Sequence, residues 1–255
     1  MRNTATLAVL AFLSLAAAFA LGHDDAAPAP APADVDIPTP RGVALKATVH
    51  RPAKGNGAAV VLAPGAGYHR GLRLMTRSAE ELAAAGFVAI RFDWAYFTAK
   101  GEPSADLATE VADLDAAVAF AKKQEGVTRV LVAGKSLGSM TTVRWGMKHK
   151  DDAAGFALLT PPMNDPEDPS KTSDRMTGFE KLGDATLLVV GDNDPLCDLA
   201  VLYRALDTTG SRQRVVIVPG DHGYIEGAKD SAETVENVDL AVRNLVVWAK
   251  RRLAK

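Results

Sequence analysis

The chain has 255 residues, of which 47% are hydrophobic and 24% charged, and its formal net charge is −2. These values are typical of a globular protein. A charge so close to neutral excludes an electrostatic argument for nucleic-acid binding, which needs a basic face. The single cysteine, Cys197, excludes an intramolecular disulfide and has no partner for a metal site, so we interpret it as a buried thiol.

Residues 1–20 have the pattern of an export signal. Arg2 adds a positive charge at the start, residues 5–21 are almost entirely apolar, and the small residues Ala18 and Ala20 stand where a signal peptidase reads the chain. The alternative is a retained membrane anchor, which the many weakly hydrophobic alanines disfavour. We expect cleavage, export to the periplasm or medium, and no stable membrane insertion afterwards; without cleavage the segment would anchor the protein.

The remainder divides into a linker and one domain. Residues 21–35 are rich in Pro and Ala and are predicted to form an extended linker. Residues 36–255 contain no internal repeat and are predicted to form a single domain.

In chain order, strand-like apolar runs alternate with helix-like segments. Residues 43–50 alternate between polar and apolar as in a half-buried edge strand, whereas residues 58–64 are continuously apolar, as in a strand covered on both faces. The elements expected next are a helix at 73–85, a strand at 87–94, a helix at 107–123, a strand at 129–133, a helix after Gly138, strands at 154–160 and 185–191, a helix at 199–206, a strand at 213–220 and a helix at 232–253.

This order predicts the α/β fold class. Buried strands that alternate with helices pair in parallel through right-handed crossovers, which gives a doubly wound, mostly parallel sheet with helices on both faces. Residues 161–183 are Pro-rich and polar and are expected to form only a minimal cap. Ligands of such sheets bind beyond the carboxyl ends of the strands, so the loops at that edge hold the candidate site.

Ser136 lies in "GKSLG", between a buried strand and a helix. A serine on such a turn is lifted clear of the sheet, and the small residues on both sides let strand and helix approach closely, which is the pattern of a nucleophile elbow. A phosphate-binding loop is excluded because it needs a glycine where Arg129 stands. A turn serine without chemistry remains the alternative.

A serine hydroxyl needs a base to become a nucleophile, and His222 is the candidate. It follows the last predicted strand directly, between Gly220 and Gly223. His69, in the loop after the second strand, is the alternative base, and "DHG" as a merely polar turn also remains open. The other histidines lie in the linker, at the far end of an early strand and late in a helix: His23, His50 and His149.

The base in turn needs a carboxylate to orient it. "GDNDPLCD" offers three, of which Asp194 is far enough past the strand to turn across the site. We expect Asp192 to organise the turn and Asp198 to cap the helix that follows. The order is then Ser136, Asp194, His222, which is the order found in α/β-hydrolases. For the oxyanion hole we predict the backbone N–H groups of Leu137 and Ala66, with Gly67 as an alternative to Ala66.

With these residues identified, the sequence resembles the α/β-hydrolase superfamily and, within it, dienelactone-hydrolase-like proteins related to the testis-expressed protein 30 and KANSL3 group. The motifs "GKSLG", "GDNDP" and "PGDHGY" carry this resemblance over residues 43–253. The resemblance implies that Ser136 is the nucleophile, Asp194 the acid and His222 the base. Many relatives have His-Gly where this chain has Pro64-Gly65, and often glycine where it has Ser139.

Two hypotheses follow. The first is a serine hydrolase that cleaves an ester, thioester or related acyl bond in a small-molecule substrate through an acyl-enzyme, with no metal and no organic cofactor. The second is a non-catalytic binding or scaffolding protein on the same fold, since a fold does not determine a function. The sequence contains no signal for an oligomeric state.

Overall fold

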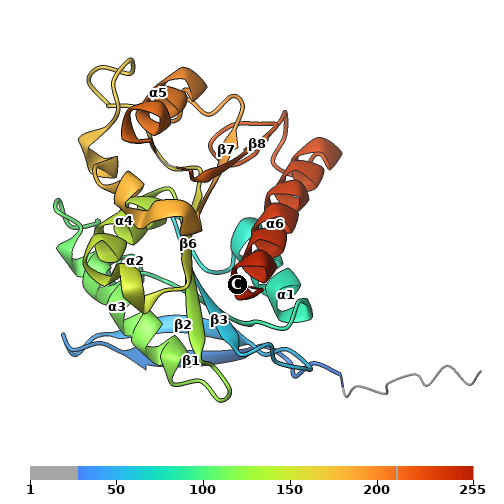
Figure 1. Cartoon of the computed structure of the whole chain (residues 1–255). Helices are drawn as coiled ribbons and strands as arrows, with labels where there is room; N and C mark the ends of the chain where they lie inside the picture. Colours follow the sequence, from blue (N-terminus) through green and yellow to red (C-terminus); the bar gives the residue numbers. More distant parts are fainter. Residues whose placement is uncertain (1–27, 211, 255) are drawn as a thin grey trace, which may run out of the picture.

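A computed structural model describes residues 28–210 and 212–254 (Figure 1). The predicted export signal and the start of the predicted linker lie outside these residues. One eight-stranded sheet with the order β1-β2-β4-β3-β5-β6-β7-β8 forms the centre of the molecule. Its strands are β1 (Ala33–Pro38), β2 (Ala44–His50), β3 (Ala58–Ala63), β4 (Val88–Phe92), β5 (Arg129–Lys135), β6 (Gly155–Leu159), β7 (Thr186–Gly191) and β8 (Arg214–Val218).

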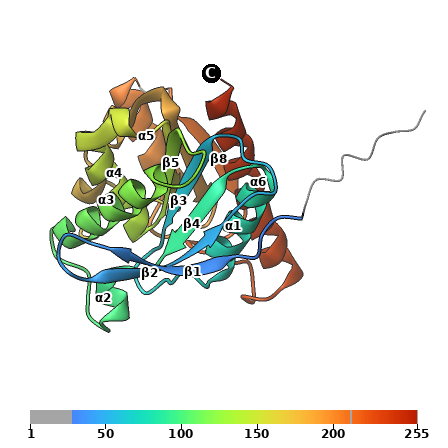
Figure 2. The same ribbon diagram turned by 90° about the horizontal axis from the view of Figure 1, so that it is seen from below.

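From β4 to β8 all neighbouring strands are parallel, and β1 and β2 add an antiparallel pair at one edge. Helices cover both faces (Figure 2). One face packs against α1 (Arg73–Ala84) and α6 (Ala232–Leu253). The other packs against α2 (Ala95–Thr98), α3 (Ala108–Lys122), α4 (Leu137–His149) and α5 (Leu199–Thr209). The predicted fold class is therefore confirmed. Short 3-10 helices lie at Lys150–Asp152, Asp174–Met176 and Phe179–Ala185.

The apolar runs are buried as their composition predicts. All six residues of β3 and all six of β7 are buried, because helices cover both faces of the sheet there. Asp198 directly precedes α5, and its carboxylate accepts the N–H groups of Ala200 and Val201, so its predicted role as a helix cap is confirmed. Among the described residues, no helix combines the length and the apolar character that a membrane crossing requires.

The strand predicted at 43–50 is present as β2, but the prediction that it forms the edge of the sheet is wrong. A turn closed by hydrogen bonds between Thr39, Gly42 and Val43 folds β1 back onto β2, so β1 is the edge. Ile37, only 1% exposed, anchors this added strand in the core. The sheet thus begins at Ala33, three residues inside the predicted linker. The Pro- and Ala-rich composition of the segment does not predict this strand. One buried side chain is enough to hold a strand whose backbone pairs with its neighbour.

Candidate active site

Ser136 stands on a sharp turn between β5 and α4. Its φ of 54° and ψ of −111° lie outside the regions that a non-glycine residue ordinarily occupies, so the turn is strained. Small neighbours make the turn possible. A Cβ atom on Gly134 would lie 2.1 Å from the carbonyl oxygen of Gly138, and one on Gly138 would lie 2.3 Å from that of Ala63. Only glycine fits at either position.

The structure brings together the three side chains that the sequence predicts for the site. The Nε2 atom of His222 lies 2.8 Å from the Oγ atom of Ser136. Its Nδ1 atom lies 2.9 Å and 3.0 Å from the two carboxylate oxygens of Asp194, which is 5% exposed. A carboxylate in this position holds the proton on Nδ1 and leaves Nε2 free to accept the serine proton.

Two loops, after β7 and after β8, present this acid and base, and hydrogen bonds join them. The Asp192 carboxylate accepts the Gly220 N–H at 2.9 Å, and the Gly220 carbonyl accepts the Asn193 N–H at 3.0 Å, so the turn role predicted for Asp192 is confirmed. The fully buried Tyr224 donates its hydroxyl to the Val189 carbonyl at 3.0 Å and ties the second loop to β7. The sequence analysis includes this tyrosine in the motif "PGDHGY" but gives it no role of its own, because no pattern distinguishes it from a core residue.

The other described histidines make local contacts instead. The alternative base, His69, uses its Nδ1 atom to accept the N–H of Gly71 at 3.1 Å. His50 is buried and accepts a hydrogen bond from Arg91 at 3.0 Å, and His149 lies at the end of α4 remote from the elbow. His222 is the one described histidine within hydrogen-bond distance of the serine.

The predicted oxyanion donors lie in the loop after β3 and at the start of α4. Among the described residues, neither the Ala66 N–H nor the Leu137 N–H, the latter in the first turn of its helix, donates to another protein group. Gly67 has a φ of 63°, and among the described residues its N–H also donates to no protein group. Burial raises the pKa of Tyr96 to about 12, and the nearby N–H of Gly67 opposes the shift. Of the two alternatives, Ala66 lines the cavity that contains Ser136, and Gly67 does not.

Two residues directly after β4 hold both ends of this loop. The Trp94 indole N–H donates to the Pro64 carbonyl at 2.9 Å, in a fully buried contact. Asp93 accepts the backbone N–H of Arg70 at 2.6 Å and pairs with its guanidinium. Sequence reasoning did not select this pair, although both residues stand at the carboxyl end of a predicted strand, the edge where site residues collect.

Lys135, the residue before the nucleophile, is 7% exposed. Its ammonium lies 5.1 Å from the centre of the Tyr68 ring, a cation–π contact, and the described residues provide it with no ion pair. Burial lowers the pKa of Lys135 to about 8, and the carboxylates of Asp194 and Asp221 oppose this shift. The folded chain thus keeps a poorly solvated cation beside the elbow.

Replacing Lys135 by methionine is expected to stabilise the protein in a pH-dependent manner. In the wild type the unfolded chain retains this proton up to about pH 10.5 and the folded chain up to about pH 8, so wild-type stability rises with pH between those values. The gain in Lys135→Met should therefore be largest below about pH 8, at most about 3 kcal/mol, and disappear by about pH 10.5. Urea unfolding of both proteins across this range measures the difference, and a constant difference would contradict the prediction.

A cavity of about 310 Å³ lies in front of Ser136. Part of its wall comes from the segment expected to be a minimal cap, residues 161–183, which contains one short 3-10 helix, the start of a second and an isolated bridge between Asn164 and Thr172. Most of the lining is apolar, from Ala66, Leu137, Met140, Pro162, Pro166, Pro169, Pro195 and Leu196. The cavity therefore offers a compact apolar space next to the serine hydroxyl.

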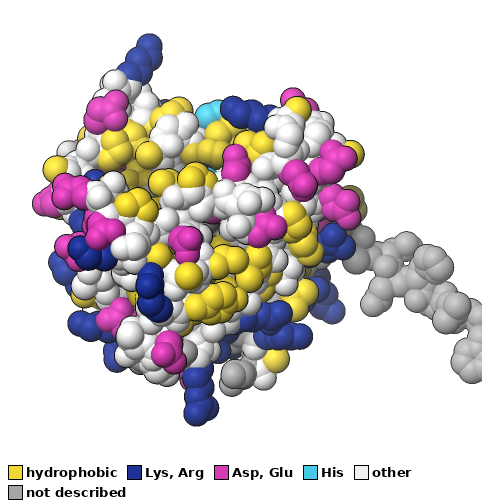
Figure 3. All heavy atoms as spheres, turned by 90° about the horizontal axis from the view of Figure 1, so that it is seen from above, with side chains coloured by type: hydrophobic (Ala, Val, Ile, Leu, Met, Phe, Trp, Pro, Cys, Tyr) yellow, Lys and Arg dark blue, Asp and Glu magenta, His cyan; other side chains and the backbone are white. Residues whose placement is uncertain are grey.

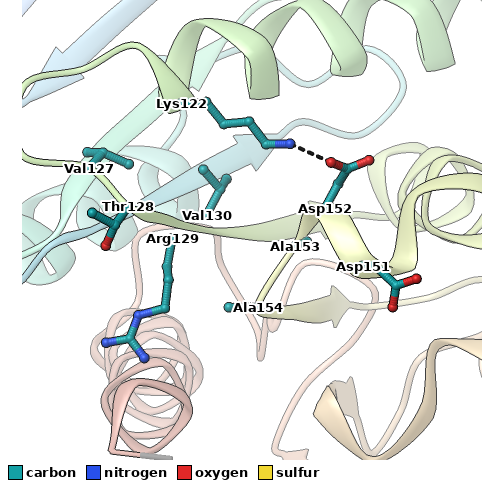
Figure 4. A pocket seen from close by; sticks show the side chains of 9 residues that line it. All are labelled: Lys122, Val127, Thr128, Arg129, Val130, Asp151, Asp152, Ala153 and Ala154. Carbon is teal, nitrogen blue, oxygen red and sulfur yellow. Dashed lines mark hydrogen bonds and ion pairs between the residues drawn. The ribbon is translucent and has the colours of Figure 1, made fainter.

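Another cavity, of about 390 Å³, lies at the opposite end of β5 (Figure 4). It is lined by the residues that begin this strand, whereas Ser136 follows its end, so the two cavities are separated by the length of the strand. Lys122 and Asp152 form an ion pair of 2.7 Å across it. Because this cavity lies at the far end of β5 and its charged residues Lys122 and Asp152 pair with each other, it is not part of the candidate site.

Charged side chains of both signs are interspersed over the face shown in Figure 3, with hydrophobic side chains between them. This dispersion agrees with the small net charge of −2. Within the described part of the chain, no group of three or more His, Cys, Asp or Glu side chains is arranged to hold a metal ion.

Comparison with known proteins gives one family and many similar folds. Residues 56–250 match the family model described as an alpha/beta hydrolase domain. The solved structure of XC6422 from Xanthomonas campestris, described as an a/b serine hydrolase without lid, is 18% identical with a TM-score of 0.63, over 86% of this chain and 94% of that one. Est1E from Butyrivibrio proteoclasticus is 18% identical with a TM-score of 0.63, over 87% and 99% of the two chains.

An alpha-beta serine hydrolase homologue from Coxiella burnetii is 21% identical with a TM-score of 0.64, over 84% of this chain and 97% of that one. At these identities the likeness concerns the fold. No curated protein matches the chain.

Proposed function

We infer the function from one premise: the chain belongs to the alpha/beta hydrolase domain family. On this premise we propose that it is a serine hydrolase that cleaves an ester, thioester or related acyl bond through Ser136, His222 and Asp194. The observation that carries the proposal is the continuous chain of short contacts from the serine hydroxyl through the imidazole to a buried carboxylate.

In the proposed reaction, His222 takes the proton of Ser136 as its Oγ atom attacks the acyl carbon. The N–H groups of Ala66 and Leu137 stabilise the oxyanion that forms. When the intermediate collapses, the bond to the leaving group breaks, and His222 gives its proton to the departing atom. Water then attacks the acyl-enzyme with His222 as the base, which releases the acid and restores the serine.

We propose two finer assignments with the same function. The motifs "GKSLG", "GDNDP" and "PGDHGY" support a place among dienelactone-hydrolase-like proteins near the testis-expressed protein 30 and KANSL3 group. Dienelactone hydrolases themselves use cysteine as the nucleophile, so their substrate is not transferred to a chain with Ser136. The apolar start of the sequence supports export of the mature protein.

Labelling with a fluorophosphonate tests the proposal directly, because the reagent modifies only an activated serine. We expect stoichiometric labelling of the folded protein, with the modified peptide containing Ser136, and turnover of short p-nitrophenyl esters that labelling abolishes. A protein that takes no label and cleaves no ester is better explained as a non-catalytic binding protein on this fold.

Trp94 and Asp93 hold the two ends of the loop at residues 64–70, which presents Ala66 and is called the oxyanion loop below. The contact of Trp94 gives a further prediction. Trp94→Phe removes the donor to the Pro64 carbonyl and keeps an aromatic ring, so the loop that presents Ala66 should lose its position. We expect kcat to fall by up to about 10²-fold with a smaller change in KM. Steady-state kinetics with a p-nitrophenyl ester measure both constants.

Trp145→Phe is the matched control. It removes an indole hydrogen bond of similar length, 3.0 Å to the exposed Asp115, from a tryptophan that is equally buried but lies on α4 away from the loop. It should lower the free energy of unfolding without the loss in kcat. Equal losses of kcat in both variants would show that Trp94 acts only through overall stability.

A further inference from the structure

Two cavities meet at the same residue, Ala66. The apolar cavity of about 310 Å³ contains Ala66 and Ser136, and a larger cavity of about 620 Å³ contains Ala66 and Gly67. Ala66 follows β3, which lies between β4 and β5 in the sheet. The smaller cavity is lined from the loops after β5, β6 and β7, and the larger from the loops after β3 and β4 and from β2. The cavities thus extend from Ala66 in opposite directions along the sheet edge.

This placement determines where the two parts of an acyl substrate can lie. If the Ala66 N–H binds the oxyanion, the carbonyl that reacts must sit between this group and the Ser136 hydroxyl. The acyl chain and the leaving group then depart from that carbon in different directions. Two cavities on the two sides of Ala66 provide one space for each.

The smaller cavity suits an acyl chain that is short and apolar. Its wall includes Met140, Leu196 and four prolines, and the ring of a proline fixes its backbone φ, so this wall is less adaptable than one made of flexible side chains alone. The two charged residues of the wall are engaged or turned to solvent: the Asp165 carboxylate accepts the N–H groups of Glu167 and Asp168, and Arg175 is exposed.

The larger cavity suits a leaving group that is bulkier and contains a ring. Helix α2 contributes Tyr96 and Phe97 to its wall, and His69 stacks on Phe97 at 5.8 Å between ring centres, so the aromatic surface is held in place. Charged side chains of both signs also line it, the exposed Lys46, Lys100 and Glu102 together with Arg70, which pairs with the buried Asp93. A ring would pack against α2 while polar substituents reach the exposed charged groups of Lys46, Lys100 and Glu102.

We propose that the substrate is an ester of a short apolar acid with a larger, ring-bearing alcohol or phenol. The acyl chain occupies the 310 Å³ cavity and the ring the 620 Å³ cavity. This inference rests on the proposed function. The bond between acyl carbon and ring oxygen breaks as the bond to Ser136 forms, the proton held by His222 passes to the ring oxygen, and water completes the hydrolysis.

Two ratios of kcat/KM test the assignment. The leaving-group ratio compares 2-naphthyl acetate with ethyl acetate, and the acyl ratio compares p-nitrophenyl butyrate with p-nitrophenyl octanoate. In the wild type we expect each of these ratios to exceed about 10. Because aryl oxides are also better leaving groups chemically, the decisive result is the change caused by each variant.

Phe97→Ala shortens the wall of the larger cavity and should lower only the leaving-group ratio, by about fivefold or more. Leu196→Ala widens the smaller cavity and should lower only the acyl ratio, because octanoate gains space. Val247→Ala, on an exposed position of α6 that lines neither cavity, is the control and should change neither ratio.

Each outcome is decisive. The assignment is supported if Phe97→Ala lowers only the leaving-group ratio and Leu196→Ala lowers only the acyl ratio. If each variant lowers the other ratio instead, the acyl chain and the leaving group occupy the opposite cavities, and the assignment is overturned. Turnover with both ratios unchanged in both variants would also overturn it, while the hydrolase function would stand. Absence of all turnover together with absence of fluorophosphonate labelling would overturn the proposed function and, with it, the substrate class.

Discussion

Ser136→Ala and His222→Ala are each expected to lower kcat for a p-nitrophenyl ester by at least about 10³-fold, and Ser136→Ala to abolish fluorophosphonate labelling. In the proposed reaction the serine supplies the atom that attacks, and His222, whose Nε2 atom lies 2.8 Å from the serine Oγ atom, is the base. The residues of such a unit act together, so we expect the double variant to lose little more than either single one. Stopped assays with purified proteins measure the losses. Labelling that persists in Ser136→Ala would contradict the assignment.

Asp194→Asn extends the same test to the orientation of the base. An amide in place of the carboxylate would favour the wrong tautomer of His222, with an expected loss of about 10⁴-fold in kcat and little change in KM. Asp198→Asn is the matched control, because asparagine caps a helix as well as aspartate and Asp198 caps α5. This control should retain full kcat. If the two variants lost activity equally, Asp194 would have no special part in the reaction.

Gly138→Ala is expected to damage the fold and the elbow together. The added Cβ would lie 2.3 Å from the carbonyl oxygen of Ala63 and 2.9 Å from that of Pro64, and both are backbone atoms that cannot rotate away. The elbow must then separate from β3 and from the oxyanion loop. We expect a loss of about 1–3 kcal/mol in the free energy of unfolding, and a loss of kcat as the distance between Ser136 and Ala66 changes. Urea unfolding and ester kinetics report the two effects.

Gly55→Ala is the control for this substitution. Its Cβ would meet no atom within 4 Å, and its φ is not positive. Alanine there should leave kcat unchanged and be neutral or slightly stabilising, because it restricts the unfolded chain. A Gly138→Ala variant as stable and active as Gly55→Ala would show that the elbow tolerates a wider separation than the structure implies.

The candidate site was predictable where local chemistry leaves few choices. Glycines flank Ser136 because a sharp strand-to-helix turn admits nothing larger, and that constraint is visible in five residues of sequence. His222 and Asp194 stand at the carboxyl ends of strands, and strand order alone places such loops at one edge of a parallel sheet. The residues chosen in this way are the ones that the structure brings within hydrogen-bond distance.

The sequence by itself therefore determined the alternation of strands and helices, the parallel sheet and the three side chains at its edge, because each depends on periodicity or on the spacing of a few neighbouring residues. Only the tertiary structure decided which strand forms the edge, what anchors the oxyanion loop, how deeply Lys135 is buried and where the two cavities meet. Those features arise from contacts between residues far apart in the chain, such as Trp94 with Pro64, 30 positions away. No local pattern encodes such a pair, because its free energy comes from burial and hydrogen bonding that exist only once the sheet has formed.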